Sequence, residues 1–353
     1  MAAWTVPSHW RTRPAERGVF MYAPVATVVC AAMLATSGVA VAAQDDPASR
    51  PPIPSAGCGA SEVEPGKYRE SMDLDGTARS WVMRVPSTHD GSTPIPLVFL
   101  FHGLLDSPGI IESQTGFGRH GLEEGFMVVA PAGRGPAPHW IEEEFGDGFS
   151  DITRANPDIV FVEALLDRLG QEACIDLARV YAAGFSNGAM ATSVVACTLE
   201  DRIAAVAAAG GLLDFGERCV LDRPVPYLAF HGRDDTSVLF DGGFPEWVLD
   251  YEIDGVAWRD LPMMEDPAFF ASIPERVAGI AARNGCTVEP STETLPLGPS
   301  EPVERWTWAC PTGAEVELLT YAAGGHDWPT ESNAGIEGTE LAWKFFEQHP
   351  MPE

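Results

Sequence analysis

Residues 181–190 read YAAGFSNGAM and hold Gly-Phe-Ser-Asn-Gly at 184–188, a G-x-S-x-G pattern. In a chain of 353 residues with 35 glycines, this pattern alone is weak evidence. Its surroundings are more informative, because residues 179–185 form an apolar run typical of a buried strand and residues 188–199 follow as a predicted helix. A strand, a sharp turn and a helix are the setting that exposes a nucleophilic serine. The sequence therefore predicts that Ser186 is a nucleophile.

The two glycines of the pattern have a steric purpose at such a turn. A sharp turn forces the serine into a strained backbone conformation, and glycines two residues before and after it remove side chains that would clash. The hydroxyl of Ser186 would then lie at the carboxyl end of a sheet, beside a helix N-terminus whose positive end favours negative charge. The backbone N–H of Asn187 would point to the place where an oxyanion forms.

A serine needs a base, and three histidines follow Ser186 in the chain: His231, His326 and His349. The expected chain order is serine, acid, histidine. His231 comes too early for this order, and His349 lies in the tail beyond the last predicted helix. His326, in the stretch GGHDWP, falls on a loop between the last predicted strand and the final helix. We expect His326 to be the base.

The acid is expected on the loop after the predicted strand VPYLAF, residues 225–230. That loop reads HGRDD and offers two adjacent aspartates, Asp234 and Asp235. Either would accept a hydrogen bond from one ring nitrogen of the histidine and stabilise the imidazolium.

A second oxyanion donor is expected on the loop after the early predicted strand PLVFLF, residues 96–101. The loop begins His102-Gly103-Leu104, and the backbone N–H of Leu104 is the candidate donor. His102 precedes the serine in the chain, so we interpret it as a structural part of the turn.

Strands and helices alternate from Lys67 onward, which predicts an α/β fold, with a mostly parallel sheet, helices on both faces and a single catalytic domain over 67–353. Asn156, followed by Pro157 and Asp158, is a predicted helix start. The predicted strands are 79–85 (an edge strand), 96–101, 126–130, 179–185, 203–209, 225–230, 305–309 and 315–321, and the later helices are 188–199, 272–284 and 334–348.

Residues 240–270 are rich in aromatic side chains but show no clear periodicity. They are expected to be a lid, a substrate wall, or a structural excursion whose aromatics pack on the core. Trp140, on a Gly/Pro-rich loop, and Trp328, close to His326, are candidates for substrate binding. Buried support is the alternative for both.

The N-terminal residues 1–43 have three arginines followed by an apolar stretch, and they predict a signal peptide cleaved near Ala42-Ala43. A membrane anchor is the alternative, but no basic cluster follows the apolar stretch. Residues 44–66, rich in Pro, Ser, Gly and Ala, are predicted to be a flexible linker. The protein is thus expected to be secreted, without a stable membrane anchor.

Cysteine content agrees with export, and charge limits the possible partners. Removal of the signal peptide would leave six cysteines, an even number that predicts disulfides. Cys286 and Cys310 are the favoured pair, because they flank one irregular stretch. The formal net charge of −29 argues against nucleic-acid and anionic-membrane partners.

Five stretches within residues 96–329 resemble the secreted esterases related to polyhydroxybutyrate depolymerases and feruloyl esterases, an α/β-hydrolase group: PLVFLFHG, ARVYAAGFSNGAM, VPYLAFHGRDD, AARNGC and GGHDWP. The resemblance implies a Ser186–His326–Asp235 triad, since the family's H-G-x-x-D form ends on Asp235. It also implies oxyanion donors at Leu104 and Asn187. The chain departs from the family in its expanded 240–270 segment and in Leu104, where a small residue is usual.

The resulting hypothesis is a secreted serine carboxylesterase that works through an acyl-enzyme and needs neither cofactor nor metal. Its expected substrates are hydroxyalkanoate polyesters or oligomers. The alternative is a feruloyl or acetyl-xylan-type esterase acting on plant polysaccharide esters. A serine peptidase and an acyltransferase are weaker alternatives that would use the same triad, and the oligomeric state stays open.

Overall fold

The computed structural model describes residues 49–135, 138–140, 152–253, 255–260, 262–265, 267–295, 302–322 and 324–352. The predicted signal peptide, residues 1–43, lies outside these residues and stays a prediction. In the part of the chain that is described, no helix combines the length and apolarity needed to cross a bilayer.

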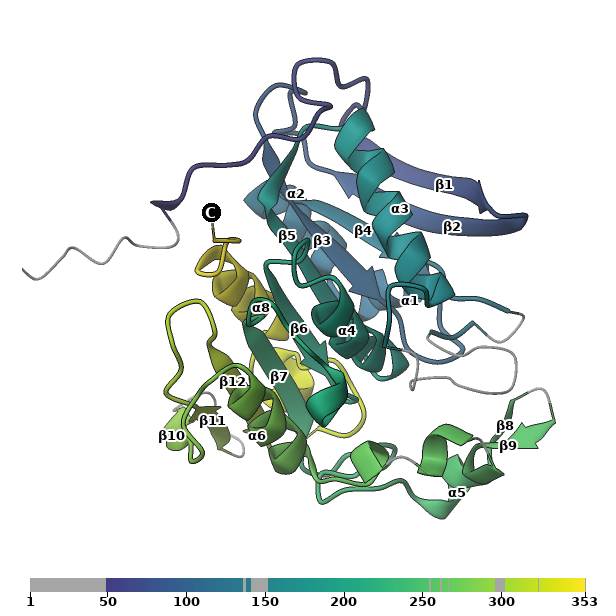
Figure 1. Cartoon of the computed structure of the whole chain (residues 1–353), viewed down its shortest axis with the longest axis vertical. Helices are drawn as coiled ribbons and strands as arrows, with labels where there is room; N and C mark the ends of the chain where they lie inside the picture. The colour runs from purple at the N-terminus through teal and green to yellow at the C-terminus, as the bar shows by residue number, and fades with distance from the viewer. Residues whose placement is uncertain are drawn as a thin grey trace, which may run out of the picture. The chain divides into compact units, whose positions relative to one another are not determined.

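A ten-stranded sheet forms the centre of the domain (Figure 1). Its strands are β1 (Gly66–Leu74), β2 (Thr77–Val85), β3 (Ile95–Phe101), β4 (Met127–Pro131), β5 (Ile175–Phe185), β6 (Ala205–Ala209), β7 (Tyr227–Gly232), β10 (Ser291–Leu295), β11 (Val303–Thr307) and β12 (Val316–Tyr321). Their order is β1-β2-β4-β3-β5-β6-β7-β12-β11-β10. The six strands in the middle of this order, β4, β3, β5, β6, β7 and β12, pair in parallel. Antiparallel strands flank them, β2 and β1 on one side and β11 and β10 on the other.

The two outermost strands correct the sequence prediction. The stretch 79–85, expected as an edge strand, lies in β2, which is second in the sheet because β1 pairs with its outer side. Strand β10, with the sequence STETL, forms the other edge. Both edge strands are polar and largely exposed, so they lack the apolar runs that reveal the central strands.

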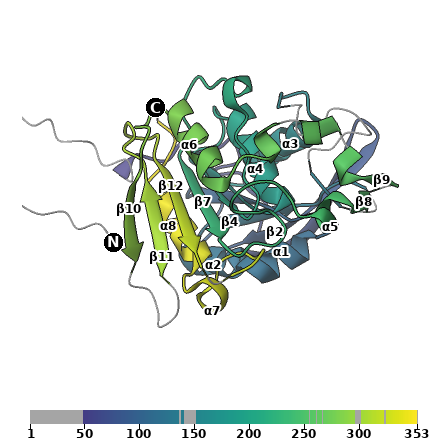
Figure 2. The ribbon, with the colours of Figure 1, turned by 90° about the horizontal axis from the view of Figure 1, so that it is seen from below.

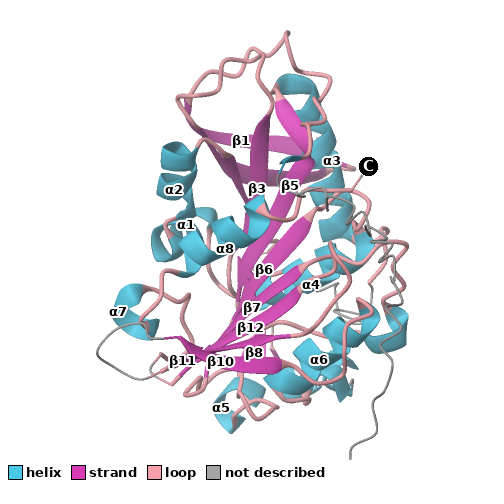
Figure 3. Cartoon of the chain, turned by 90° about the vertical axis from the view of Figure 1, so that its left-hand side faces the viewer, coloured by secondary structure: helices cyan, strands magenta, loops and turns pink. Residues whose placement is uncertain are grey.

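Helices cover both faces of the sheet, as expected (Figure 3). One face carries α1 (Pro108–Thr115), α2 (Phe117–Glu124) and α8 (Gly338–Glu347), which follows the single turn α7 (Glu331–Ala334). The other carries α3 (Pro157–Glu172), α4 (Asn187–Thr198) and α6 (Ile273–Arg283). The predicted start of α3 is confirmed, because the Asn156 side chain accepts a hydrogen bond from the Asp158 N–H at 2.9 Å.

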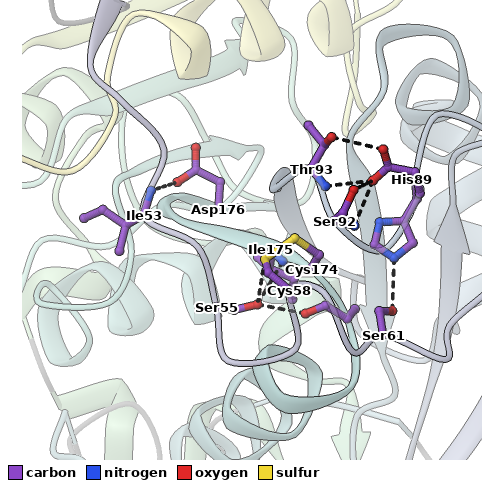
Figure 4. Close-up of a disulfide and its surroundings, with 12 residues drawn as sticks. Ile53, Ser55, Cys58, Ser61, His89, Ser92, Thr93, Cys174, Ile175 and Asp176 are labelled. Atoms are coloured by element: carbon purple, nitrogen blue, oxygen red, sulfur yellow. Dashed lines mark hydrogen bonds between the residues drawn. A yellow bond between two sulfur atoms is a disulfide. The ribbon is translucent and has the colours of Figure 1, made fainter.

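The described part of the predicted linker is attached to the domain. The Ser55 hydroxyl donates to the Ala173 carbonyl at 2.8 Å, and a disulfide joins Cys58 to Cys174 (Figure 4). From residue 49 onward, the prediction of a flexible linker over 44–66 is therefore wrong. Two further disulfides, Cys197–Cys219 and Cys286–Cys310, use the other four cysteines of the described residues, and the second confirms the favoured pair.

Residues 240–270 leave the domain after β7 and return to it at α6. They contain α5 (Glu246–Leu249), the short strands β8 (Glu252–Ile253) and β9 (Val256–Ala257), and three 3₁₀ turns, η4 (Trp258–Asp260), η5 (Pro262–Glu265) and η6 (Pro267–Phe269). Another 3₁₀ turn, η3 (Gly216–Arg218), precedes β7 and lies outside this segment. The segment lies beyond the carboxyl ends of the central strands, away from the β10 edge (Figures 1 and 2). Since parallel α/β folds bind ligands at that end of the sheet, the segment is placed to shape a binding site.

Candidate active site

Ser186 occupies a strained turn between β5 and α4, with φ 56° and ψ −122°. A Cβ on Gly184 would lie 2.2 Å from the Gly188 carbonyl oxygen, and one on Gly188 would lie 2.2 Å from the Phe101 carbonyl oxygen. Neither contact is tolerable, so the close approach of α4 to β5 and to the end of β3 requires both glycines. The G-x-S-x-G pattern thus has a steric cause in this fold.

Three side chains from distant parts of the chain form a continuous hydrogen-bonded series. His326 Nε2 lies 2.7 Å from Ser186 Oγ, and His326 Nδ1 lies 2.8 Å from Asp235 Oδ2. The other carboxylate oxygen, Oδ1, accepts hydrogen bonds from the N–H groups of Ser237 and Val238 at 2.8 and 2.9 Å. An ionised carboxylate can only accept, so Nδ1 of His326 donates to it and the Nε2 lone pair faces the serine hydroxyl.

The structure also distinguishes the two candidate aspartates. Asp235 is 4% exposed, whereas the neighbouring Asp234 is exposed to solvent. Burial by itself would raise the pKa of Asp235, but the hydrogen bond and charge of His326, with smaller contributions from His231 and the Ser237 N–H, lower it below its ordinary value. Asp235 is therefore ionised at neutral pH, as a group that orients an imidazole must be.

Two buried histidines support the loops around this site without titrating near neutral pH. His102 Nε2 accepts from the Gly133 N–H at 2.9 Å, so Nδ1 carries the proton and donates to the Gly103 carbonyl at 2.7 Å. His231 Nε2 lies 2.9 Å from the Val238 carbonyl and therefore donates to it. Burial lowers the pKa of each imidazole to about 4. The structural interpretation of His102 is confirmed.

We expect these two histidines to make the domain less stable as the pH falls from 6.5 towards 4. In the unfolded chain each binds a proton near pH 6.5, but in the folded chain only near pH 4, so the unfolded state binds more protons in this window. The free energy of unfolding should fall by up to about 3 kcal/mol per histidine across it. Urea unfolding between about pH 7 and about pH 5 measures the slope. His231→Gln keeps a donor for Val238 and should reduce the slope; an unchanged slope in this variant would contradict the assignment.

The loop after β3 brings the second candidate oxyanion donor to the serine. A Cβ on Gly103 would lie 3.4 Å from Ser186 Cβ, so the loop passes directly beside Ser186. Leu105 holds the loop in shape: it has φ 62°, and its N–H donates to the Pro138 carbonyl at 2.8 Å. The backbone N–H groups of Leu104 and Asn187 have no acceptor among the described residues, which leaves both available to a ligand.

A cleft of about 210 Å³ opens at Ser186 and His326. Both Leu104 and Asn187 line it, and a further wall comes from the 240–270 segment through Phe244, Trp247, Val248, Tyr251 and Trp258. Phe244, Trp258 and Phe269 of this segment are also buried, while Trp247 and Tyr251 are 59% and 39% exposed. The segment is thus both a wall of the cleft and a small apolar cluster packed on the domain.

Neither tryptophan predicted to bind substrate lines the cleft. Trp140 is fully buried; its N–H donates to Asn187 Oδ1 at 2.8 Å and its indole Nε1 donates to the His102 carbonyl at 2.9 Å. Trp328 is 3% exposed, and its Nε1 donates to Thr339 Oγ1 at 3.1 Å. The prediction of substrate contact is wrong for both, because their rings support the active-site loops from behind.

Sequence reasoning also missed lining residues, among them Met190 on α4 and Val238 after the acid. Both are apolar residues close in sequence to the catalytic candidates, and nothing in the sequence distinguishes them from core residues. Within the described ranges, no group of three or more His, Cys, Asp and Glu side chains is arranged to hold a metal ion.

A strained serine between two glycines, hydrogen-bonded in series to a histidine and a buried aspartate at the carboxyl end of a mostly parallel sheet, defines the α/β-hydrolase fold and its serine site. A solved acetyl xylan esterase from Aspergillus awamori has this fold and superposes with a TM-score of 0.53 at 13% identity, over 80% of this chain and 99% of that one.

Curated relatives specify the class further. The chain is 29% identical to feruloyl esterase B of Piromyces equi over 282 residues, covering 78% of this chain but only 46% of that protein. It is 26% identical to a probable feruloyl esterase C of Aspergillus niger over 278 residues, covering 76% of this chain and 83% of that protein. No family model matches the chain. The chain thus spans about half the length of the first of these relatives, both are named as esterases, and what the solved structure shares with it is the α/β-hydrolase fold.

Proposed function

We propose that Ser186, His326 and Asp235 hydrolyse esters through an acyl-enzyme. His326 Nε2 takes the proton as Ser186 Oγ attacks the ester carbonyl carbon, and Asp235 stabilises the imidazolium. The Leu104 and Asn187 N–H groups stabilise the oxyanion. When the tetrahedral intermediate collapses, His326 returns the proton to the leaving alcohol. Water, activated by His326, then attacks the acyl-enzyme, and the acid and free Ser186 are released.

We further propose that the acyl group is aromatic, as in feruloyl esters of plant polysaccharides. The observation that carries this proposal is the aromatic wall of the cleft, formed by Trp247, Tyr251 and Trp258, which line the same cleft as Ser186. Aromatic side chains interact favourably with a substrate ring in stacked or edge-to-face contacts. The cleft volume of about 210 Å³ is below the roughly 300–1,000 Å³ typical of sites for drug-sized ligands. It therefore suits one ring and a short chain, with the remainder of the substrate outside.

The similarity to feruloyl esterases supports this substrate class better than the polyhydroxybutyrate depolymerases of the initial hypothesis. The shape of the site agrees, because an acetyl or hydroxybutyrate group would leave much of the aromatic wall without a contact. Export is part of the proposal: three disulfides within the described residues suit an oxidising compartment.

A substrate panel tests the proposal. We expect kcat/KM for methyl ferulate and methyl p-coumarate to exceed that for methyl acetate by at least about tenfold, because only the first two esters contact the aromatic wall. Hydroxybutyrate oligomers and p-nitrophenyl acetate complete the panel, and a peptide anilide tests the peptidase alternative. Faster hydrolysis of hydroxybutyrate oligomers than of methyl ferulate would reject the aromatic-acyl proposal while leaving the esterase class intact.

A further inference from the structure

The aromatic wall is carried by the 240–270 segment, a loop whose two ends lie side by side. A Cβ on Gly242 would lie 2.4 Å from the Phe270 carbonyl oxygen, and the Ile273 N–H donates to the Phe240 carbonyl at 2.9 Å. Gly242 and Gly243 both have positive φ, at 104° and 78°. The wall thus leaves and rejoins the domain at one place, so the attachment there determines where its aromatic side chains lie relative to Ser186.

Arg276, on the first turn of α6, occupies this attachment point. Its side chain is 1% exposed and donates three hydrogen bonds to backbone carbonyls: Nε to Ala271 at 2.9 Å, Nη2 to Phe269 at 2.7 Å and Nη1 to Leu212 at 2.9 Å. Within the described residues no carboxylate pairs with it. Burial lowers its pKa to about 10, so it stays charged at neutral pH.

The three acceptors join two different structures. Phe269 and Ala271 end the wall, whereas Leu212 belongs to the loop after β6, which passes behind the nucleophile. In that loop a Cβ on Gly211 would lie 2.4 Å from the Ser186 carbonyl oxygen, so the loop and the serine turn are in direct contact. Arg276 therefore connects the returning end of the wall to the backbone that supports Ser186.

We propose that Arg276 is a positioning residue that fixes the aromatic wall relative to Ser186 and so determines selectivity for aromatic acyl groups. A buried guanidinium is costly unless its donors are paired, and these three carbonyls pair with three of its N–H groups only when the wall and the Leu212 loop are both in place. The wall is thereby held in one arrangement. The inference rests on the proposed function for its substrate class, but not for its geometry.

Two p-nitrophenyl esters with the same leaving group test the inference: the 3-phenylpropanoate, which reaches the wall, and the acetate, which does not. We expect Arg276→Met to lower the ratio of kcat/KM for phenylpropanoate over acetate by about tenfold, mainly through a higher KM for the aromatic ester. Arg276→Lys keeps the charge but not the three-way geometry, and it should give an intermediate ratio. In Arg276→Met, amide hydrogen exchange over residues 244–270 should accelerate, while that of β5 and β6 should not.

Arg223 provides a matched control. Its guanidinium also donates to three backbone carbonyls, of Glu200, Ile203 and Pro224, and burial lowers its pKa to about 10 as well. It lies before β7, at the end of the sheet opposite to the cleft. Arg223→Met should lower stability without changing the ratio.

The outcomes separate the inference from the proposed function. An unchanged ratio in both Arg276 variants, or an equal change in Arg223→Met, would overturn the positioning role. If Arg276→Met does not fold, the ratio in Arg276→Lys decides. If the wild-type protein hydrolyses the phenylpropanoate but not methyl ferulate, the feruloyl proposal fails while the inference stands. A wild-type protein with no preference for the phenylpropanoate would overturn the inference itself.

Discussion

Replacing Ser186 by alanine is expected to lower kcat for p-nitrophenyl butyrate by about 10⁵- to 10⁶-fold, with little change in KM. The reason is geometric. Ser186 Oγ lines the cleft and lies 2.7 Å from His326 Nε2, and alanine leaves the other lining residues in place while removing the hydroxyl that is proposed to attack. Steady-state kinetics with the purified full-length chain measures the effect.

Ser186→Ala should unfold at the same temperature as the wild-type protein or at a slightly higher one. The variant loses only the hydrogen bond to His326, and the strained φ of 56° at position 186 remains. Ser193→Ala, on the helix α4 that follows Ser186, is a suitable control. Its hydroxyl is buried against Tyr227 and lies outside the cleft lining, so its loss should reduce stability more than kcat. Hydrolysis at the wild-type rate in Ser186→Ala would reject the acyl-enzyme mechanism.

Asp235→Asn is expected to lower kcat by about 10⁴-fold, whereas Asp234→Asn should leave it unchanged. Asp235 Oδ1 accepts two backbone N–H groups, so an asparagine would keep its carbonyl oxygen there and turn its NH₂ group towards His326 Nδ1. Nδ1 would then have to accept, and Nε2 would carry the proton and face Ser186 in the wrong tautomer. The loss should therefore fall on kcat rather than on binding.

The adjacent pair makes the comparison well controlled, because both variants remove one negative charge from the same loop. Only Asp235 is buried and bonded to His326; Asp234 is exposed. The kcat of both variants on one ester, measured together with the thermal unfolding of each, distinguishes the orientation of His326 by Asp235 from the effect of removing one negative charge from the loop. Equal losses in the two variants would contradict the role given to Asp235.

Much of this site could be predicted from sequence because its residues lie in short stretches whose local sequence pattern indicates their place in the fold. The apolar strand, the two glycines and the following helix identify Ser186, and the loop positions after later strands lead to His326 and to the Asp234–Asp235 pair. Such signals are short-range: they depend on the backbone geometry of a few consecutive residues. The choice between the two aspartates is different in kind, since only the direction of the side chain decides it.

The failures share one physical cause. Trp140 and Trp328 have the residue type and the approximate location of substrate-binding side chains, but burial and their hydrogen bonds place them behind the active-site loops. The edge strands β1 and β10 are polar on exposed faces, so no apolar pattern predicts them. In each case the outcome depends on which other segment packs against the residue.

The sequence by itself determined the α/β class, the candidate nucleophile, the candidate base and one disulfide, because each depends on local backbone geometry, on the order of residues along the chain or on two cysteines close in sequence across one hairpin. Only the tertiary structure decided that Asp235 faces His326, that residues 240–270 form an aromatic wall of the cleft, and that Arg276 joins this wall to the loop behind Ser186. These features depend on contacts between segments tens of residues apart. Long-range packing, which no local pattern encodes, determines them.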